Sequence, residues 1–331
     1  MLAPGGHQDN RGVAAAQARR AGADRATARA APRARLTRIK RDTLIGFVLC
    51  HALAALALLP WFFSWAGVAL FAIGVFAFGL LGINVGFHRL LAHRGFACPL
   101  WLERMLALLG TGCMQFSPAF WVAVHRRHHQ FSDEAGDPHS PRRGFWWAHF
   151  GWLVARRPKD MTPGMLTQRY AKDLLRDPLY AFLERKNVWA MTALGFWALF
   201  FAAGAAAAAA AGASAAEALQ LGTSLVVWGG ALRTVFVWHT TWAVNSVSHI
   251  WGYRSHDTPD DSRNNWVVAL LAGGEGWHNN HHADPVAPRH GHAWWEIDLA
   301  WCAIWALMRL GLATPRRAAR ADGATAPGRA P

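Results

Sequence analysis

The chain contains few charged residues for its length. Only 16% of its 331 residues are charged and 53% are hydrophobic, whereas about 25% of the residues in a typical soluble protein carry charge. Asp, Glu, Lys and Arg are absent altogether from residues 43–88 and from residues 187–216. Because a helix needs roughly 20 apolar residues to cross a bilayer, these stretches indicate an all-α integral membrane protein. They exclude a soluble nucleic-acid-binding protein and a purely extracellular one.

Cysteine is also scarce, and its placement excludes several kinds of site. The four cysteines, at positions 50, 98, 113 and 302, are far apart and form no CxxC pair. Such scattered thiols cannot hold an iron–sulfur cluster, and disulfides are not expected on a cytoplasmic face. We recognise no electron-transfer module in the chain, so electrons for any redox chemistry are expected to come from a separate protein.

The apolar segments predict four membrane-spanning helices arranged as two hairpins. The spans are expected at about residues 44–63, 65–87, 188–211 and 220–243. The first is expected to break near Pro60, and the segments outside the hairpins are predicted to form a cytoplasmic helical cap. The membrane domain would occupy residues 36–313, flanked by low-complexity tails, 1–35 and 314–331, that we expect to be disordered.

The positive charges are distributed unevenly along the chain. The net charge is +14, yet the short connections at residues 60–64 and 212–220 contain no Lys or Arg. Basic residues are instead concentrated before residue 44 and within residues 87–187. Since Lys and Arg are retained on the cytoplasmic side, both termini and the cap are predicted to be cytoplasmic. This basic face would suit anionic lipid head groups or an acidic partner protein.

Nine of the seventeen histidines gather in short motifs. The motifs are HRLLAH, HRRHH and HNNHH, and a fourth, NSVSH, adds an asparagine. Each motif lies where a predicted span leaves the bilayer or within the predicted cap. The residues concerned are His88, His93, His125, His128, His129, Asn245, His249, His278, His281 and His282.

The spacing within the motifs predicts that these side chains converge. Residues at i, i+3 and i+4 share one face of a helix, so HRRHH and HNNHH each present three imidazoles together. His88 and His93 are five residues apart, about 140° around an ideal helix, and would converge only if the helix ends or bends there. Nine imidazoles exceed the four ligands of one zinc ion but suit two ions with four or five each. Imidazole binds iron, zinc, copper and nickel, and a redox-active pair best explains so many at a membrane surface.

Together with DPHSPRRGFWWAH and EGWHNNHH, these motifs resemble those of the membrane fatty acid desaturase family, of the stearoyl-CoA or acyl-lipid Δ9 type. The resemblance covers about residues 40–312. It implies a centre of two iron ions ligated by the nine clustered histidines, with Asn245 reaching a metal through water. The pattern WVAVHRRHH is closer to bacterial and cyanobacterial members, some of which act on glycerolipid-bound chains, than to animal acyl-CoA members.

The activity that the resemblance implies is O2-dependent introduction of a cis double bond, at the Δ9 position, into a saturated acyl chain carried on CoA or a glycerolipid. The electron donor would be a ferredoxin, a rubredoxin or a cytochrome b5-type protein. A membrane di-iron hydroxylase or alkane monooxygenase is the alternative, because hydroxylation and desaturation begin with the same hydrogen abstraction. A metal transporter would need polar ligands along a path inside the bilayer, whereas these histidines are predicted to lie outside it.

Five further residues are expected to shape a tunnel for the acyl chain. Gln115, Trp121 and Thr241 match family positions at the bend around the reacting carbons. Phe76 and Leu80 lie four residues apart, on the helix face that leads to the first clustered histidine. We expect this pair to approach the methyl end of the chain and to limit its length.

Charged residues beside the motifs suggest supporting contacts. Asp137 and Glu275 are expected to hydrogen-bond to ligating imidazoles, which usually donate their second N–H to a carboxylate or a carbonyl. Arg126 would bind an anionic head group or the redox partner, or remain a solvated charge. Arg233, within the fourth span, is expected to extend its charge toward the interface.

Overall fold

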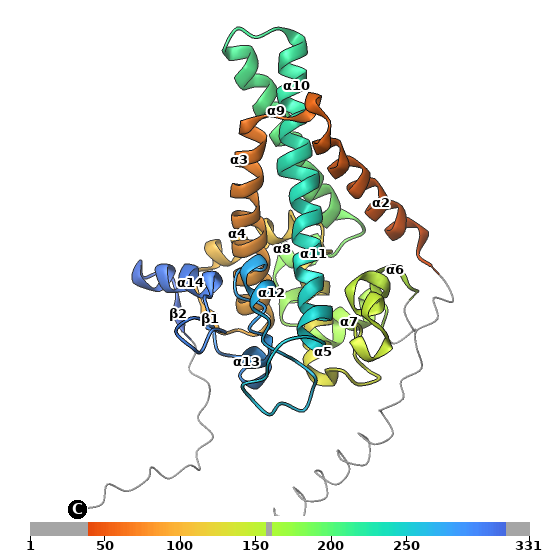
Figure 1. Cartoon of the computed structure of the whole chain (residues 1–331), viewed down its shortest axis with the longest axis vertical. Coiled ribbons are helices and arrows are strands. Elements are labelled where there is room, and N and C mark those ends of the chain that lie inside the picture. Colours follow the sequence, from red (N-terminus) through yellow and green to blue (C-terminus); the bar gives the residue numbers. More distant parts are fainter. Residues whose placement is uncertain (1–38, 157–160, 316–331) are drawn as a thin grey trace, which may run out of the picture.

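The computed structural model describes residues 39–156 and 161–315. Four of its helices are long and apolar enough to cross a membrane: Arg41–Leu58, Trp65–Ala92, Val188–Ala210 and Ala215–His249. They form the upper part of the molecule, and shorter helices surround their lower ends (Figure 1). The expected tail at 1–35, and all but the first two residues of the one at 314–331, lie outside the described residues.

The first apolar helix breaks just before Pro60, as the sequence predicted. Helix α2 (Arg41–Ala55) continues through the short η1 (Leu56–Leu58), and Leu59 then adopts an extended backbone before η2 (Pro60–Phe62). Proline has no N–H to donate and forces the preceding residue away from helical angles. The helix therefore stops before Pro60, and residues 60–62 form the separate η2.

The second apolar helix extends beyond its expected end. Helix α3 (Trp65–Gly74) begins at Ser64, whose side chain accepts a hydrogen bond from the Gly67 N–H, and it continues as the π-helix η3 (Val75–Ala92). The His93 N–H donates to the His88 carbonyl at 3.1 Å, an i→i+5 bond that places the two residues one π-helical turn apart. The helix also ends after Ala92. The π-helical turn and the helix end together bring the His88 and His93 side chains to the same side of the helix.

The π-helix packs closely against α4 (Leu100–Thr111), where two glycines meet. A Cβ on Gly82 would lie 2.4 Å from the Gly110 nitrogen, and a Cβ on Gly110 would lie 2.8 Å from the Gly82 carbonyl oxygen. Small residues allow helix backbones to approach this closely. Two-residue strands β1 (Phe96–Ala97) and β2 (Thr314–Pro315) pair antiparallel beside these helices, so the first two residues of the expected tail form a strand instead.

The third and fourth apolar helices lie side by side at the top of Figure 1. Helix α9 (Val188–Ala210) is followed by α10 (Ala215–Leu225), which begins with a capping box between Ser214 and Glu217. From α10 the helix continues without a break through η8 (Val226–Leu232), α11 (Arg233–Ser246) and η9 (Val247–His249). This long helix carries a histidine ligand candidate down to the lower half of the molecule.

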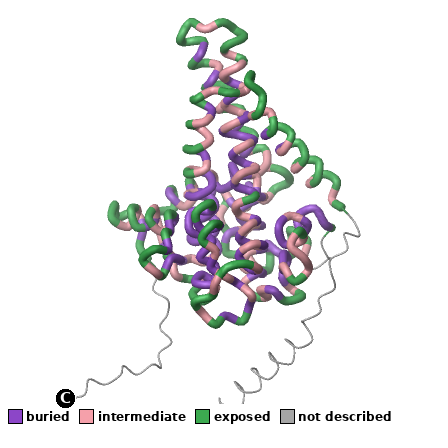
Figure 2. The backbone as a smooth tube through the Cα atoms, in the orientation of Figure 1, coloured by how far each residue is buried: buried purple, intermediate pink, exposed green. Residues whose placement is uncertain are grey.

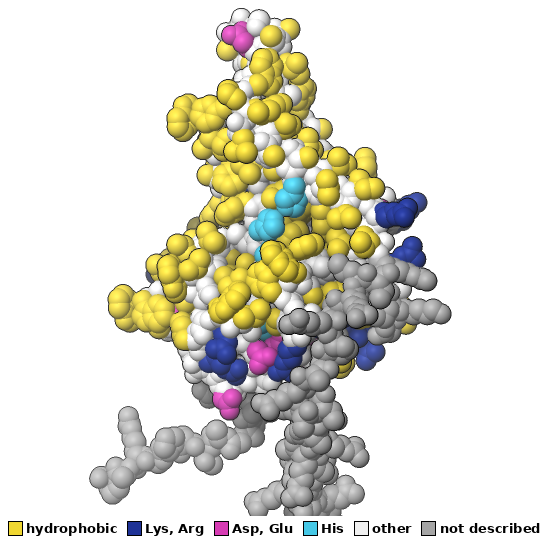
Figure 3. Space-filling model, turned by 45° about the vertical axis from the view of Figure 1, so that its right-hand side comes forward, with side chains coloured by type: hydrophobic (Ala, Val, Ile, Leu, Met, Phe, Trp, Pro, Cys, Tyr) yellow, Lys and Arg dark blue, Asp and Glu magenta, His cyan; other side chains and the backbone are white. Residues whose placement is uncertain are grey.

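The lower half is built from short helices. Their bounds are α5 (Pro118–Phe131), η4 (Pro141–Arg143), η5 (Trp147–Gly151), α6 (Trp152–Val154), α7 (Pro163–Tyr170), η7 (Leu174–Arg176), α8 (Pro178–Leu183), α12 (Trp266–Leu271), α13 (His278–Ala283) and α14 (Leu299–Arg309). Buried residues concentrate here, whereas the upper helices are largely exposed (Figure 2). The exposed upper surface is hydrophobic, and charged side chains gather below (Figure 3). A hydrophobic exposed surface over the four long helices is what a membrane-spanning region requires.

Arg233 does not extend toward an interface as the sequence suggested. Its side chain is fully buried, and it donates to the carbonyl oxygens of Gly112 at 2.8 Å and Gly229 at 3.0 Å. The guanidinium also lies 4.3 Å over the ring of Phe78. The turn after α4 and the π-helix close over this position, so the arginine ties the fourth apolar helix to that turn.

Candidate metal centre

All nine clustered histidines meet in the lower half of the molecule, in two groups. The end of η3 with His93, helix α5, the end of η9 and helix α13 each contribute ligand candidates. Within each group the potential donor atoms all lie within 4.8 Å of one another. The first group is His88, His93, His125, His129 and His281, and the second is His128, His249, His278 and His282.

Two helices divide their histidines between the groups. Helix α5 begins at Ser117, whose side chain accepts from the Phe120 N–H, with Pro118 in its first turn. Its HRRHH motif sends the first and third imidazoles to the first group and the second to the other. Helix α13 likewise sends His281 to the first group and its two remaining histidines to the second. The shared helix face predicted from the spacing therefore spans both groups.

Imidazole nitrogens face each other across the first group. The Nε2 atoms of His93 and His125 are 2.6 Å apart. The Nε2 atom of His281 lies 3.1 Å from that of His88 and 3.0 Å from that of His129. Five ring nitrogens thus point into one small space.

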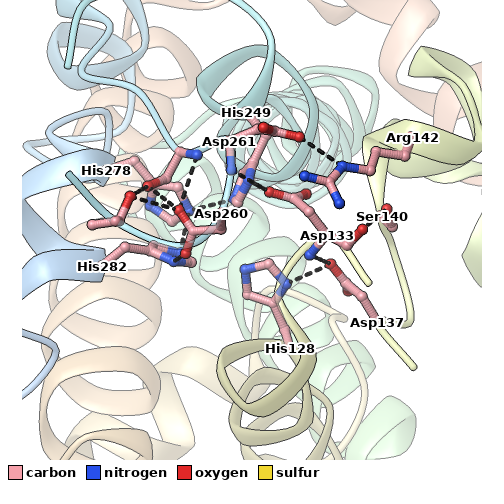
Figure 4. Close-up of polar contacts among 12 residues, drawn as sticks. His128, Asp133, Asp137, Ser140, Arg142, His249, Asp260, Asp261, His278 and His282 are labelled. Atoms are coloured by element: carbon pink, nitrogen blue, oxygen red, sulfur yellow. Dashed lines mark hydrogen bonds and ion pairs between the residues drawn. The ribbon is translucent and has the colours of Figure 1, made fainter. Parts of the chain in front are cut away.

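The second group has the same character (Figure 4). The Nε2 atom of His278 lies 3.0 Å from that of His249 and 3.1 Å from that of His282. The Nε2 atom of His128 is buried and has no hydrogen-bond partner within residues 39–156 and 161–315. An unpartnered buried nitrogen is costly unless another group binds it.

A carboxylate holds the other ring nitrogen of four of these histidines. As expected, Asp137 and Glu275 are in this position: Nδ1 of His128 is 3.0 Å from Asp137, and Nδ1 of His88 is 2.6 Å from Glu275. Two further carboxylates were not predicted from the sequence. Their contacts are His249 Nδ1 to Asp133 at 3.0 Å and His282 Nδ1 to Asp260 at 2.6 Å.

These carboxylates are fixed by the backbone and by other charges. Asp137 accepts from the N–H groups of Asp133 and His139, and Glu275 accepts from Arg89. Burial alone would raise the pKa of Asp137, but the His128 and His139 imidazoles lower it below its usual value. Asp133, Asp260 and Glu275 likewise have lowered pKa values despite burial. All four are therefore ionised acceptors at neutral pH.

Six of the clustered imidazoles have lowered pKa values and are neutral at neutral pH. Burial, followed by repulsion from neighbouring imidazoles, lowers the pKa well below the usual value in five of them: His93, His125, His129, His278 and His281. Burial also lowers the pKa of His282 to about 4. A neutral imidazole that donates Nδ1–H to a carboxylate has only a lone pair at Nε2. The Nε2 atom of His282, whose Nδ1 is held by Asp260, therefore carries a lone pair toward its group, which a cation bound there would satisfy.

Two apolar cavities adjoin these groups. The distal cavity, of about 240 Å³, runs from Ala72 past Phe76, Leu80 and Asn84 to His88. The proximal cavity, of about 50 Å³, lies among Phe47, Met114, Gln115, Trp152 and Trp238. Both are lined by Trp121, His125, Thr241 and Asn245.

The structure thus places all five predicted tunnel residues along these cavities. Gln115, Trp121 and Thr241 are joined by hydrogen bonds at their junction. The Gln115 amide donates to the Thr241 hydroxyl at 3.0 Å, and the Trp121 indole N–H donates to the Gln115 carbonyl at 3.1 Å. Phe76 and Leu80 line the distal cavity but not the proximal one. Asn245 lies at the junction beside a histidine of the first group.

Neighbouring side chains differ in part from the sequence interpretation. Arg126 turns inward, donating to the carbonyl oxygens of Leu91 and Ala92 and pairing with Asp173 at 2.8 Å. It closes the end of the π-helix, a structural role that was not among the expected ones. Two more buried imidazoles flank the groups: the His290 ring lies 4.4 Å from that of His281, and the His139 ring 4.4 Å from that of His128.

Comparison with known proteins agrees with this arrangement. The family model described as fatty acid desaturase matches residues 63–316. The sn-1 stearoyl-lipid 9-desaturase of Anabaena variabilis is 43% identical over 81% of this chain and 90% of its own. The sn-2 palmitoyl-lipid 9-desaturase of Nostoc sp. is 40% identical over 85% of this chain and 92% of its own. Icosanoyl-CoA 5-desaturase of Limnanthes douglasii is 41% identical over 82% of this chain and 70% of its own. The chain therefore belongs to the fatty acid desaturase family, whose members are oxidoreductases of lipid metabolism.

Proposed function

We propose that the protein is an O2-dependent acyl desaturase that introduces a cis double bond, at the Δ9 position, into a saturated acyl chain carried on a glycerolipid or on CoA. One observation carries the proposal: nine inward-facing imidazoles lie directly beside an apolar, two-part cavity. Relatives that act on lipid-bound and CoA-bound chains support both carriers.

We further propose that each histidine group holds one iron ion and that Asn245 contributes through water. An all-imidazole donor set suits iron, and the converging ring nitrogens and the unpartnered His128 nitrogen support this assignment. When bound, the iron pair supplies the O2 activation that removal of two hydrogens from an unactivated methylene pair requires. Overall, one O2, two electrons and two protons would convert the methylene pair to a double bond and yield two waters. A separate ferredoxin, rubredoxin or cytochrome b5-type protein would deliver the electrons.

In this proposal the protein positions the acyl chain. A saturated chain offers no polar group to bind, so the walls of the cavities must select two carbons and hold them beside the imidazoles. The hydrogen-bonded Gln115, Trp121 and Thr241 fix the junction of the two cavities. A chain that turns at this junction would have its reacting carbons beside His125, and the turn would favour a cis product.

The membrane arrangement follows from the same reasoning. We propose that the apolar helices form two hairpins, that the domain comprises residues 36–313, and that the histidine-bearing lower half is a cytoplasmic cap. Both termini would then be cytoplasmic. The uneven distribution of basic residues and the separation of hydrophobic from charged surface (Figure 3) support this orientation.

Phe76 and Leu80 are predicted to limit the length of the acyl chain. Both line the distal cavity, so Phe76→Ala or Leu80→Ala should lengthen it and admit longer substrates. Mass spectrometry of the lipid products should show a shift toward longer unsaturated chains. Ile73→Ala is the matched control, because Ile73 is exposed on the same helix and does not line this cavity. A chain-length profile that stays the same in both cavity variants would reject this role.

Asp260 is predicted to support metal binding through His282. Removing the carboxylate partner of a ligating histidine typically costs about 10- to 100-fold in metal affinity or activity. Asp260→Asn should therefore lower iron affinity by roughly that factor, measured by titration with a competing chelator. Asp284→Asn, an exposed carboxylate next to the same helix, should leave the affinity unchanged. Equal iron retention in the two variants would show that Asp260 does not tune the site.

The proposed activity is tested by expressing the chain in a host that lacks unsaturated fatty acids. Mass spectrometry would then locate any new double bond in each lipid class. A double bond nine carbons from the carboxyl end supports the proposal. Hydroxylated chains without a double bond would instead identify a hydroxylase, and saturated lipids alone would contradict both activities.

A further inference from the structure

Three histidines outside the metal groups form a hydrogen-bonded chain. They are His51 on α2, His239 on α11 and His149 on η5. The Nε2 atoms of His51 and His239 are 3.1 Å apart, and His239 Nδ1 lies 3.0 Å from His149 Nε2. At one end His51 Nδ1 is 2.7 Å from the Phe47 carbonyl, and at the other His149 Nδ1 is 2.9 Å from the Ser246 hydroxyl.

This histidine chain opens onto the hydrophobic face of the molecule. His239 is exposed and His51 half-buried, and histidine side chains are visible amid the hydrophobic surface in Figure 3. Both line a third cavity, the lateral cavity, of about 430 Å³. Its remaining lining is entirely apolar: Leu44, Phe47, Val48, Ala52, Phe150 and Trp242. Polar side chains at such a surface are costly and usually functional.

The lateral cavity adjoins the cavities of the metal centre. Phe47 and Trp242 line both the lateral and the proximal cavity. The proximal cavity in turn shares its junction with the distal cavity. The three cavities therefore lie in series, from the surface between α2 and α11, past His125, to Phe76 and Leu80, with Phe47 and Trp242 between the lateral and the proximal cavity.

The chemistry of the histidine chain suits a neutral acceptor. In the tautomers that give His239 an Nε2–H, His51 donates Nδ1–H to the Phe47 carbonyl and its Nε2 accepts from His239. His149 then donates Nε2–H to His239 Nδ1 and accepts at Nδ1 from the Ser246 hydroxyl, which would turn to it from the Trp242 carbonyl. Burial lowers the pKa of His149 to about 4, so this end of the chain is uncharged at neutral pH. The exposed His239 N–H can donate to an incoming carbonyl oxygen in place of His51 Nε2. This exchange costs little, because one hydrogen bond replaces another. An uncharged donor matches an ester carbonyl better than a phosphate.

We propose that the lateral cavity is the port through which the acyl chain of a membrane glycerolipid enters from the bilayer, with the His239 N–H donating to its ester carbonyl. This proposal rests on the proposed function and specifies its carrier. The chain would pass between Phe47 and Trp242 to the histidines of the first group, while the glycerol backbone would stay at the surface.

The port is tested with iron-loaded protein reconstituted in lipid nanodiscs with an electron-donor system. The probes are distearoylphosphatidylcholine in the nanodisc and stearoyl-CoA added in solution. Ala52→Trp fills the lateral cavity and should slow desaturation of the phosphatidylcholine by about 10-fold, equivalent to about 1.4 kcal/mol. Leu49→Trp is the control, since Leu49 is exposed on the same helix and does not line the cavity. It should react at the wild-type rate.

A second variant tests the hydrogen bond itself. His239→Phe removes the donor and should raise KM for phosphatidylcholine by about 3- to 10-fold with little change in kcat, the value of one net hydrogen bond. Iron content is measured in every variant, so that loss of folding is recognised separately.

The outcomes separate the port from the proposed function. Normal desaturation of phosphatidylcholine by Ala52→Trp would overturn the port, and so would wild-type protein that acts on stearoyl-CoA alone. Wild-type protein that desaturates neither probe while holding its iron would contradict the proposed function itself.

Discussion

Replacing His128 with alanine is expected to abolish desaturation and to deplete one of the two histidine groups of its metal. His128 supplies one of four converging nitrogens in the second group, and its removal also takes away one of the two imidazoles beside the buried Asp137. Since loss of a supporting residue alone costs about 10- to 100-fold, loss of a ligand should exceed about 100-fold. Double-bond formation and iron per chain are measured on the same purified sample.

His292→Ala is the matched control for this substitution. His292 is an exposed histidine of the lower half, beside His256 and in neither metal group. Its loss should leave both iron content and activity at the wild-type level. Surviving turnover in His128→Ala, with two irons still bound, would count decisively against the ligand assignment.

Replacing Gly82 with alanine is expected to disrupt the fold around the site. The added Cβ would lie 2.4 Å from the backbone nitrogen of Gly110, and a backbone atom cannot rotate away as a side chain can. Forcing η3 away from α4 should cost about 1–3 kcal/mol or more. It would also displace the helix that carries His88 and lines the distal cavity. The expected result is a lower melting temperature in detergent, together with reduced activity.

The control for Gly82→Ala is Gly195→Ala. Gly195 lies within α9, and a Cβ there would meet no atom within 4 Å, so alanine should be neutral or slightly stabilising because it favours the helix. Equal melting temperatures for the two variants would show that the contact between η3 and α4 is not a tight one.

The prediction of the site rested mainly on the spacing of the histidines. The i, i+3 and i+4 positions of HRRHH and HNNHH identified side chains that the structure does bring together. The five-residue separation of His88 and His93 was harder to interpret, because an ideal α-helix places them on different sides. A π-helix cannot be recognised from hydrophobic spacing, and its wider turn is what aligns them.

The carboxylate partners were predicted only where they lie beside a motif. Asp260 is 22 residues from His282, and helix α12 with irregular segments on both sides lies between them, so no periodicity links them. Asp133 follows α5 directly but sits at φ 63°, a turn that no helix pattern foresees. Tertiary packing, which single-sequence patterns do not contain, determines which nearby carboxylate reaches which imidazole.

The positions of two arginine side chains also could not be predicted from sequence patterns. Composition and position allowed Arg126 and Arg233 to face lipid, solvent or a partner. Both instead donate to backbone carbonyls in the interior. Helix ends and turns leave such carbonyls unsatisfied, but which side chain satisfies them depends on segments that meet only in the folded protein.

The central claim is that two metal ions lie among the nine clustered imidazoles. The most direct test is an experimental structure of the iron-loaded protein, with anomalous scattering recorded at the iron absorption edge. The account predicts two peaks, one surrounded by the Nε2 atoms of His88, His93, His125, His129 and His281, the other by those of His128, His249, His278 and His282. A single peak, or iron bound away from these side chains, would contradict it.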